Sequence, residues 1–90
     1  MSKRTKIFIS YASTDKEQKR IVRKRLSKLL DIDRFLIWDD SNISHGKYES
    51  VIKKQIHESD IFIFLISDSF LKSDFIVNKE LPWIQNIYRR

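Results

Sequence analysis

The sequence contains no cysteine, one glycine and one proline. Without cysteine, neither a disulfide nor a thiolate metal site can form, which fits a reducing compartment. With Gly46 as the lone glycine, the phosphate-binding P-loop, the GxGxxG dinucleotide fingerprint and the GxSxG nucleophile elbow are all excluded, since each needs several glycines. Any nucleotide site in this chain must therefore be built from other residues.

Long hydrophobic runs are also absent. No apolar run approaches the roughly 18 residues of a membrane span, and the N-terminus has no signal-peptide core. We therefore expect a cytoplasmic protein with no membrane partner. Hydrophobic residues make up 41% and charged residues 33% of the chain, which is typical of globular proteins. We expect one small domain over residues 1–90, burying about 60–65% of its unfolded surface.

The most apolar stretch is Asp60–Ser67, which holds six consecutive apolar residues and ends in a serine. An unbroken run of this length is typical of a strand that is covered on both faces, as in a parallel sheet between two layers of helices. In such sheets, functional residues gather just past the carboxyl ends of the strands. The segment from Ser67 to Glu80 is therefore the first place to look for chemistry.

Two shorter apolar runs, residues 6–11 and 34–38, predict two further strands. Between them, Thr14 and Glu17 fit a capping box, which predicts that a helix begins there. The predicted helix carries an apolar stripe at three- and four-residue spacing, formed by Ile21, Val22, Leu26, Leu29 and Leu30.

A second amphipathic helix is predicted to begin at Tyr48. After a short helical turn at Phe70 and Leu71, a third helix is predicted from about residue 74 to residue 88, with Pro82 near its first turns, where proline is tolerated. Strand and helix thus alternate three times. With right-handed crossovers, this order predicts an α/β fold in which a parallel sheet forms the middle of three layers.

Three groups of residues stand out in chain order. They are Phe8-Ile9-Ser10-Tyr11, then Ile37-Trp38-Asp39-Asp40 with Gly46 downstream, then Ile66-Ser67 followed by Phe70-Leu71-Lys72-Ser73 and Glu80-Leu81. Together, in this order and at these spacings, they resemble the Toll/interleukin receptor (TIR) domain, especially its bacterial members. The resemblance covers nearly the whole chain and implies a flavodoxin-like fold.

TIR domains have five parallel strands, whereas this sequence supplies three and stops after the third strand–helix unit. If the strand order is 2-1-3, the run 60–67 lies at an exposed sheet edge, which is an aggregation hazard. We therefore expect a partial TIR domain, or a sheet that a partner completes.

Many TIR domains hydrolyse NAD⁺ at the nicotinamide–ribose bond, using one glutamate on the helix after the third strand. Glu80 holds that position, so the resemblance implies a catalytic role for it, with NAD⁺ as substrate and no bound cofactor. The alternative is a helix-surface carboxylate beside Lys79. In the family an aromatic residue often stands four positions before the glutamate; here Ile76 is there, and Phe75 stands five before.

A single carboxylate suits this chemistry. Nicotinamide leaves a pyridinium as a neutral molecule, so the leaving group needs no general acid. The oxocarbenium-like sugar is what requires stabilisation, and a nearby carboxylate can supply it.

The resemblance also implies substrate-binding positions after each strand, namely Ser10, Tyr11, Ala12, Trp38, Asp39 and Ser67. Each has a structural alternative. The first three would simply end a strand and begin a loop, the tryptophan would pack in the core, and the aspartate would form a turn. Ser67 would hydrogen-bond the backbone at the end of its strand.

The loop 39–47 matches a family loop that makes head-to-tail contacts and helps to cover a neighbour's active site. Asp40, Ile43, Gly46 and Lys47 are therefore candidates for contacts with other TIR domains. The alternative is a plain exposed connection, which leaves the apolar Ile43 unexplained.

The net charge of +6 permits binding to nucleic acid. However, the basic first helix lacks interleaved aromatic residues that could stack on bases, so we expect a solvated face and no nucleic-acid partner. His45 and His57 lie far apart without a ligand cluster, and no metal site is expected.

Two functions remain open, and a basic nucleic-acid-binding module is a weaker third. The first is an NAD⁺ hydrolase in signalling or in anti-phage and immune defence, activated by self-association. The second is a non-enzymatic adaptor, in which the same loops make TIR–TIR contacts and Glu80 is structural.

Overall fold

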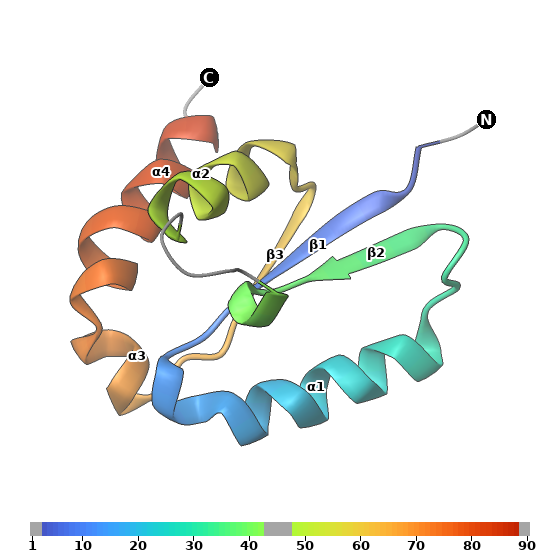
Figure 1. Cartoon of the computed structure of the whole chain (residues 1–90), viewed down its shortest axis with the longest axis horizontal. Coiled ribbons are helices and arrows are strands. Elements are labelled where there is room, and N and C mark those ends of the chain that lie inside the picture. Colours follow the sequence, from blue (N-terminus) through green and yellow to red (C-terminus); the bar gives the residue numbers. More distant parts are fainter. Residues whose placement is uncertain (1–2, 43–47, 89–90) are drawn as a thin grey trace.

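The structure is a computed structural model that describes residues 3–42 and 48–88. Three parallel strands form one sheet in the order β2-β1-β3 (Figure 1). The strands are β1 (Thr5–Ser10), β2 (Phe35–Trp38) and β3 (Ile61–Phe64). The predicted α/β fold is confirmed, and the strand order is the 2-1-3 order that leaves the third strand at the sheet edge. The third strand is shorter than the apolar run that predicted it, because Phe64 lies opposite Ser10, the last residue of β1, and among the described residues only one further hydrogen bond, from the Leu65 N–H to the Ser10 carbonyl, follows.

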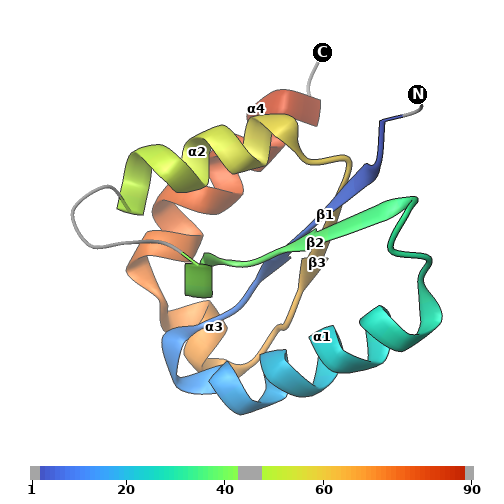
Figure 2. The ribbon, with the colours of Figure 1, turned by 45° about the vertical axis from the view of Figure 1, so that its right-hand side comes forward.

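Helices lie on both sides of this sheet. The main helices are α1 (Lys16–Leu29), α2 (Tyr48–Glu58), α3 (Asp68–Lys72) and α4 (Leu81–Tyr88). Short 3₁₀ turns span Ser13–Asp15 and Asp40–Asn42, and a π-helical turn spans Ile76–Glu80. Figure 2 shows α2 and α4 on one side of the sheet and α1 on the other. No helix in the described ranges is both long and apolar enough to cross a membrane.

The main core lies between the sheet and the α2–α4 layer. Phe8 of β1 packs there with Ile52 and Ile56 of α2 and with Ile84 of α4. Trp38 of β2 stacks on Phe8, with ring centroids 5.2 Å apart. Each of these large apolar side chains stabilises the fold by about 1.5–3 kcal/mol when fully buried. This face of the sheet is therefore closed and well packed.

The opposite face of the sheet is covered only in part. Ile7 and Ile9 are buried there, but α1 contains no buried residue, and Ile21 and Leu29 of its apolar stripe are 45% and 81% exposed. At the sheet edge, Ile61 of β3 is 41% exposed. The prediction of helices over both faces of this strand is confirmed, but the cover over its α1 face is incomplete at Ile61. One helix covers that face, and no strand of the described residues lies beyond β3.

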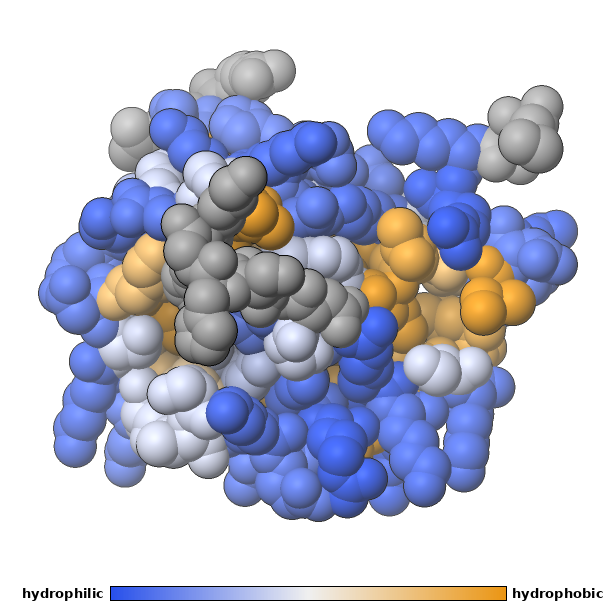
Figure 3. All heavy atoms as spheres, viewed as in Figure 1, coloured by the Kyte–Doolittle hydropathy of each residue, from blue (hydrophilic) through white to orange (hydrophobic). Residues whose placement is uncertain are grey.

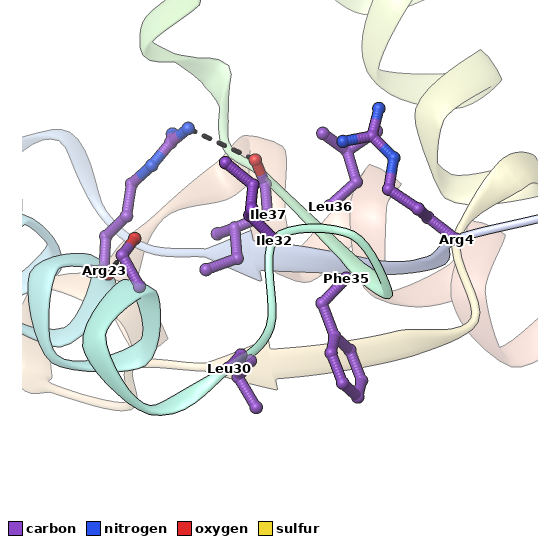
Figure 4. Close-up of a pocket in the computed structure, with 8 residues that line it drawn as sticks. Arg4, Arg23, Leu30, Ile32, Phe35, Leu36 and Ile37 are labelled. Atoms are coloured by element: carbon purple, nitrogen blue, oxygen red, sulfur yellow. Dashed lines mark hydrogen bonds between the residues drawn. The ribbon is translucent and has the colours of Figure 1, made fainter.

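The incomplete cover exposes an apolar patch over β2 and the turn before it, on the right of Figure 3. A groove of about 180 Å³ runs there between α1 and β2 (Figure 4). Its lining residues are Arg4, Arg23, Ser27, Leu30, Ile32, Phe35, Leu36 and Ile37. Across the groove, the Arg23 guanidinium donates a hydrogen bond of 3.2 Å to the backbone oxygen of Ile37.

Helix α1 begins differently from the prediction. Its N-cap is Asp15, without a side-chain capping hydrogen bond, so the predicted Thr14–Glu17 capping box is wrong. The carboxylate of Asp15 instead accepts a hydrogen bond of 2.5 Å from Ser67 Oγ, and that of Glu17 pairs with Arg20. Asp15 thus pairs with a distant residue and Glu17 with a residue of its own helix, and neither side chain caps the helix.

The helix predicted over residues 74–88 is not a continuous α-helix. At Leu81 the backbone N–H donates to the carbonyl of Ile76, five residues earlier, which defines a π turn. The predicted bounds of the helix hold, since residues 74–75 are α-helical before the π turn and α4 runs on to Tyr88 after it, with Pro82 as the second residue of α4. The turn that ends at Glu80 therefore holds one residue more than an α-helical turn.

Candidate functional site

The only buried glutamate among the described residues lies at the carboxyl end of the central strand. Glu80, the last residue of the π turn, is 4% exposed, and Ser10, the last residue of β1, is 2% exposed. Ser10 Oγ donates a hydrogen bond of 2.9 Å to Glu80 Oε1. The neighbouring Lys79 forms its ion pair with Glu49 of α2, at 3.0 Å, on the exposed side of the helix. The alternative interpretation of Glu80 as a surface carboxylate is therefore wrong.

Burial changes the acidity of Glu80. Removal of the carboxyl from water raises its pKa to about 7, against the opposing effect of the hydrogen bond from Ser10. The negative charge of Asp40 adds to the increase. At neutral pH, Glu80 therefore exists in both protonation states. A carboxyl with such a shifted pKa at the carboxyl end of a parallel strand is a candidate functional group.

Tyr11 follows Ser10 and lies between the sheet and α1. Its ring lies 5.3 Å from Lys19 Nζ, and its hydroxyl is hydrogen-bonded to the Asp40 side chain. Burial, this hydrogen bond, and the negative charges of Asp40 and Asp39 all raise the pKa of Tyr11 above its ordinary value. The hydroxyl therefore stays protonated, and Tyr11 and Asp40 form a stable pair.

Two spaces of different size lie on either side of the Tyr11–Asp40 pair. Around Glu80, the gap that this pair lines with Ser10 and Ile52 has no room for a water-sized sphere. On the other side, Tyr11 and Asp40 line an open cleft of about 640 Å³, within the range of roughly 300–1,000 Å³ for small-molecule sites. The pair is thus a shared wall between a closed carboxyl site and an open cleft.

Asp39 carries a buried charge at the end of β2. Its carboxylate is fully buried, lies 2.5 Å from Arg23 and 3.5 Å from Lys19, and accepts a hydrogen bond of 2.8 Å from the Ser41 backbone N–H. Burial raises its pKa, but the hydrogen bonds from Ser41 and Arg23 outweigh this effect and hold the pKa below its ordinary value. The contacts of Asp39, like the stacking of Trp38 in the core, are those of the structural alternatives.

Ser67 and Ala12 lie apart from the Ser10–Glu80 contact. Ser67 is the N-cap of α3, and its Oγ accepts a hydrogen bond of 3.0 Å from the Phe70 N–H. This confirms the backbone hydrogen bond predicted for it. Ala12 is buried in a second small core with Phe70 and Ile76. Among the substrate-binding positions implied by the resemblance, Ser10 and Tyr11 are therefore the two that line the Glu80 gap.

The predicted interaction loop is described only at its beginning. Asp40 starts a 3₁₀ turn and belongs to the wall described above. Ile43, Gly46 and Lys47 lie outside the described residues, and their predicted contacts with other TIR domains stay predictions.

Sequence reasoning missed Lys19 and Arg23, which hold the Asp39 carboxylate. The available signal was their spacing, because cations four residues apart on a helix share one face. It also missed the bond between Tyr11 and Asp40, for which the sequence carries no local signal.

Comparison with known proteins agrees with this architecture. The TIR domain family model matches residues 7–89, a range that includes the end of β1, the β2 terminus and the π turn. No curated protein and no solved structure matched the chain. Since the family match extends over nearly the entire chain, this protein belongs to the TIR domain family.

Proposed function

We propose that this TIR domain is an NAD⁺ hydrolase that cleaves the bond between nicotinamide and ribose. The observation that carries the proposal is the buried hydrogen bond of 2.9 Å between Ser10 and Glu80 at the carboxyl end of the central strand. A buried carboxyl with a raised pKa is costly to the fold, and such groups gather at functional sites. The TIR family includes NAD⁺ hydrolases, which fits this reading of the site.

In the proposed reaction, the bond between C1′ of the ribose and the pyridinium nitrogen breaks. The electron pair goes to the nitrogen, so nicotinamide leaves as a neutral molecule. Water then adds to C1′ and releases a proton. Glu80 in its ionised form stabilises the positive charge that develops on the sugar, and Ser10 orients the carboxylate by donating to Oε1.

The closed gap around Glu80 supports control of this activity. The gap has no room for a water-sized sphere, so NAD⁺ can reach the carboxylate only after residues around the gap move. Asp40 is one of these residues, and it belongs to the loop 39–47 that is predicted to contact other TIR domains. We therefore propose that self-association opens the site, as in a cytoplasmic signalling or defence protein. Roles for Ala12, Trp38, Asp39 and Ser67 in NAD⁺ binding stay predictions.

A second candidate function is that of a non-enzymatic TIR–TIR adaptor. Two observations favour it: the gap at Glu80 has no room for substrate, and the β3 edge exposes Ile61. In this case the hydrogen bond between Ser10 and Glu80 would serve only to join β1 to the π turn.

Nicotinamide release across a series of protein concentrations separates the two functions. For a hydrolase activated by self-association, release per molecule rises with protein concentration in the wild type and stays at background in Glu80→Ala. For an adaptor, the folded wild type releases no nicotinamide at any concentration. Circular dichroism and a cooperative thermal transition establish that each protein is folded.

A further inference from the structure

The open cleft beside Tyr11 is lined mainly by charged side chains of α1. Its lining residues are Tyr11, Ser13, Lys16, Glu17, Lys19, Arg20, Asp40 and Ser41. Three of these side chains are cationic and two are anionic. The apolar groove between α1 and β2 is smaller, at about 180 Å³, and the larger cleft is the one that adjoins the Glu80 gap.

Both anionic side chains of the cleft already have partners. Glu17 pairs with Arg20 within α1, and Asp40 is hydrogen-bonded to the Tyr11 hydroxyl. Lys16 is exposed and, within the described part of the chain, forms no ion pair. The cleft thus presents an available ammonium group to a ligand, next to the Arg20 guanidinium.

The position of the cleft relates it to the proposed reaction. Tyr11 and Asp40 line both the cleft and the gap around Glu80, so the two spaces are one side-chain layer apart. In NAD⁺, the ribose that is attacked at C1′ carries the diphosphate on its 5′-carbon. A dinucleotide whose scissile bond faces Glu80 therefore places its phosphates one sugar ring away, on the side of the neighbouring cleft that shares Tyr11 and Asp40 with the gap.

We propose that this cleft is a phosphate subsite, in which Lys16 and Arg20 bind the diphosphate of a nucleotide whose ribose faces Glu80. The inference rests on the proposed function and extends it, because it assigns the binding of the substrate's diphosphate to residues of α1. Lysine binds phosphate as a point charge and arginine as a planar pair of donors, so the two side chains together suit a diphosphate. Arg20 would exchange Glu17 for the ligand.

Direct binding of ADP-ribose tests the subsite without turnover, because this molecule carries the diphosphate and lacks the nicotinamide bond. Isothermal titration calorimetry compares the wild type with Lys16→Ala and with Lys28→Ala. Lys28 is the matched control, since it is an exposed lysine on α1 that does not line the cleft. We expect Lys16→Ala to weaken binding about 5- to 10-fold and Lys28→Ala by less than about 2-fold, with adenosine binding unaffected by either change.

The dependence of ADP-ribose binding on ionic strength is a second readout. Increased ionic strength is expected to weaken ADP-ribose binding more in the wild type than in Lys16→Ala, because the variant has lost one charge contact. Equal loss in the two lysine variants, or no binding of ADP-ribose by the folded wild type, would overturn the subsite.

The outcomes separate this inference from the proposed function. If ADP-ribose binding depends on Lys16 but no nicotinamide is released, the subsite is supported and the hydrolase is contradicted. Nicotinamide release with the same KM for NAD⁺ in wild type and Lys16→Ala supports the hydrolase and overturns the subsite.

Discussion

Ser10 and Glu80, 70 positions apart in the sequence, meet in a buried hydrogen bond of 2.9 Å. This contact joins the end of the central strand to the π turn that follows α3. Because the serine donates, it favours the ionised carboxylate, while burial favours the protonated acid. The balance leaves a carboxyl that titrates near neutral pH, and several measurable consequences follow from it.

The stability of the fold should decrease as pH rises from about 4.5 to about 7. The pKa of Glu80 is about 7 in the folded state against 4.5 for the free side chain, so in this range the folded state binds the proton more tightly than the unfolded state. The free energy of unfolding should fall by roughly 3 kcal/mol, and Glu80→Gln should remove this decrease. Urea unfolding at pH 5 and pH 8 measures the decrease in wild type and in Glu80→Gln. The same decrease in the two proteins would contradict the assignment to Glu80.

Loss of the Ser10 hydroxyl should shift the pH dependence of activity. The hydrogen bond from Ser10 lowers the pKa of Glu80, so Ser10→Ala raises that pKa further. If the ionised carboxylate is the active form, kcat/KM for NAD⁺ rises with pH through about 7 in the wild type. The rise should lie at higher pH in Ser10→Ala and should not move in Ser27→Ala, which removes an exposed hydroxyl of α1 that lines neither the cleft nor the Glu80 gap. Coincident profiles for wild type and Ser10→Ala would argue against the role of Ser10.

Asp39→Asn should destabilise the fold strongly. The substitution leaves Arg23 and Lys19 without the buried carboxylate that they share. Removing one partner of a buried ion pair costs about 3–5 kcal/mol, and the partial exposure of Arg23 places the expected loss near the lower limit. The exposed Asp33→Asn should change stability by less than about 0.5 kcal/mol. Chemical denaturation compares the two variants, and a similar small effect for both would show that the buried pair contributes little.

The π turn should tolerate the deletion of one residue. Val77, Asn78 and Lys79 all face solvent, and the turn holds one residue more than an α-helical turn. Deletion of Val77 should convert it to an α-helical turn with a loss of stability of about 1 kcal/mol or less. Deletion of Lys54 in α2 should instead prevent folding, since it rotates Ile56 out of the core. A Val77 deletion as damaging as that of Lys54 would mean that the π turn itself is required for the fold.

The layered α/β fold could be predicted from the sequence because apolar runs and stripes report burial directly. The ends of the strands and helices could not be predicted in the same way. The run that ends at Ser67 contains Leu65 and Ile66, yet sheet pairing stops at Phe64, since pairing depends on the length of β1 and not on hydropathy. The Thr14–Glu17 capping box failed for a related reason, because Arg20 is a competing partner for Glu17.

The candidate site could be predicted only where a family pattern marks it. Glu80 and Ser10 stood out through the resemblance, but no local pattern indicates their contact, which depends on the π turn. In the family an aromatic residue often stands four positions before the glutamate, whereas Phe75 stands five positions before Glu80. The π turn, which holds one extra residue, lies within that interval. Likewise, the pairing of Tyr11 with Asp40 joins residues that follow different strands, β1 and β2, and requires the folded sheet.

Nicotinamide release by Glu80→Gln, measured beside wild type and Glu49→Gln, tests the central claim most directly. Glutamine has nearly the shape of a protonated glutamic acid, so Glu80→Gln should fold at least as stably as wild type at pH 7.5 while lacking the carboxylate. Glu49→Gln removes an exposed carboxylate on α2 and controls for the change in charge. The account predicts release by wild type and Glu49→Gln and a decrease of about 100-fold or more in Glu80→Gln. Equal release by all three proteins would contradict it.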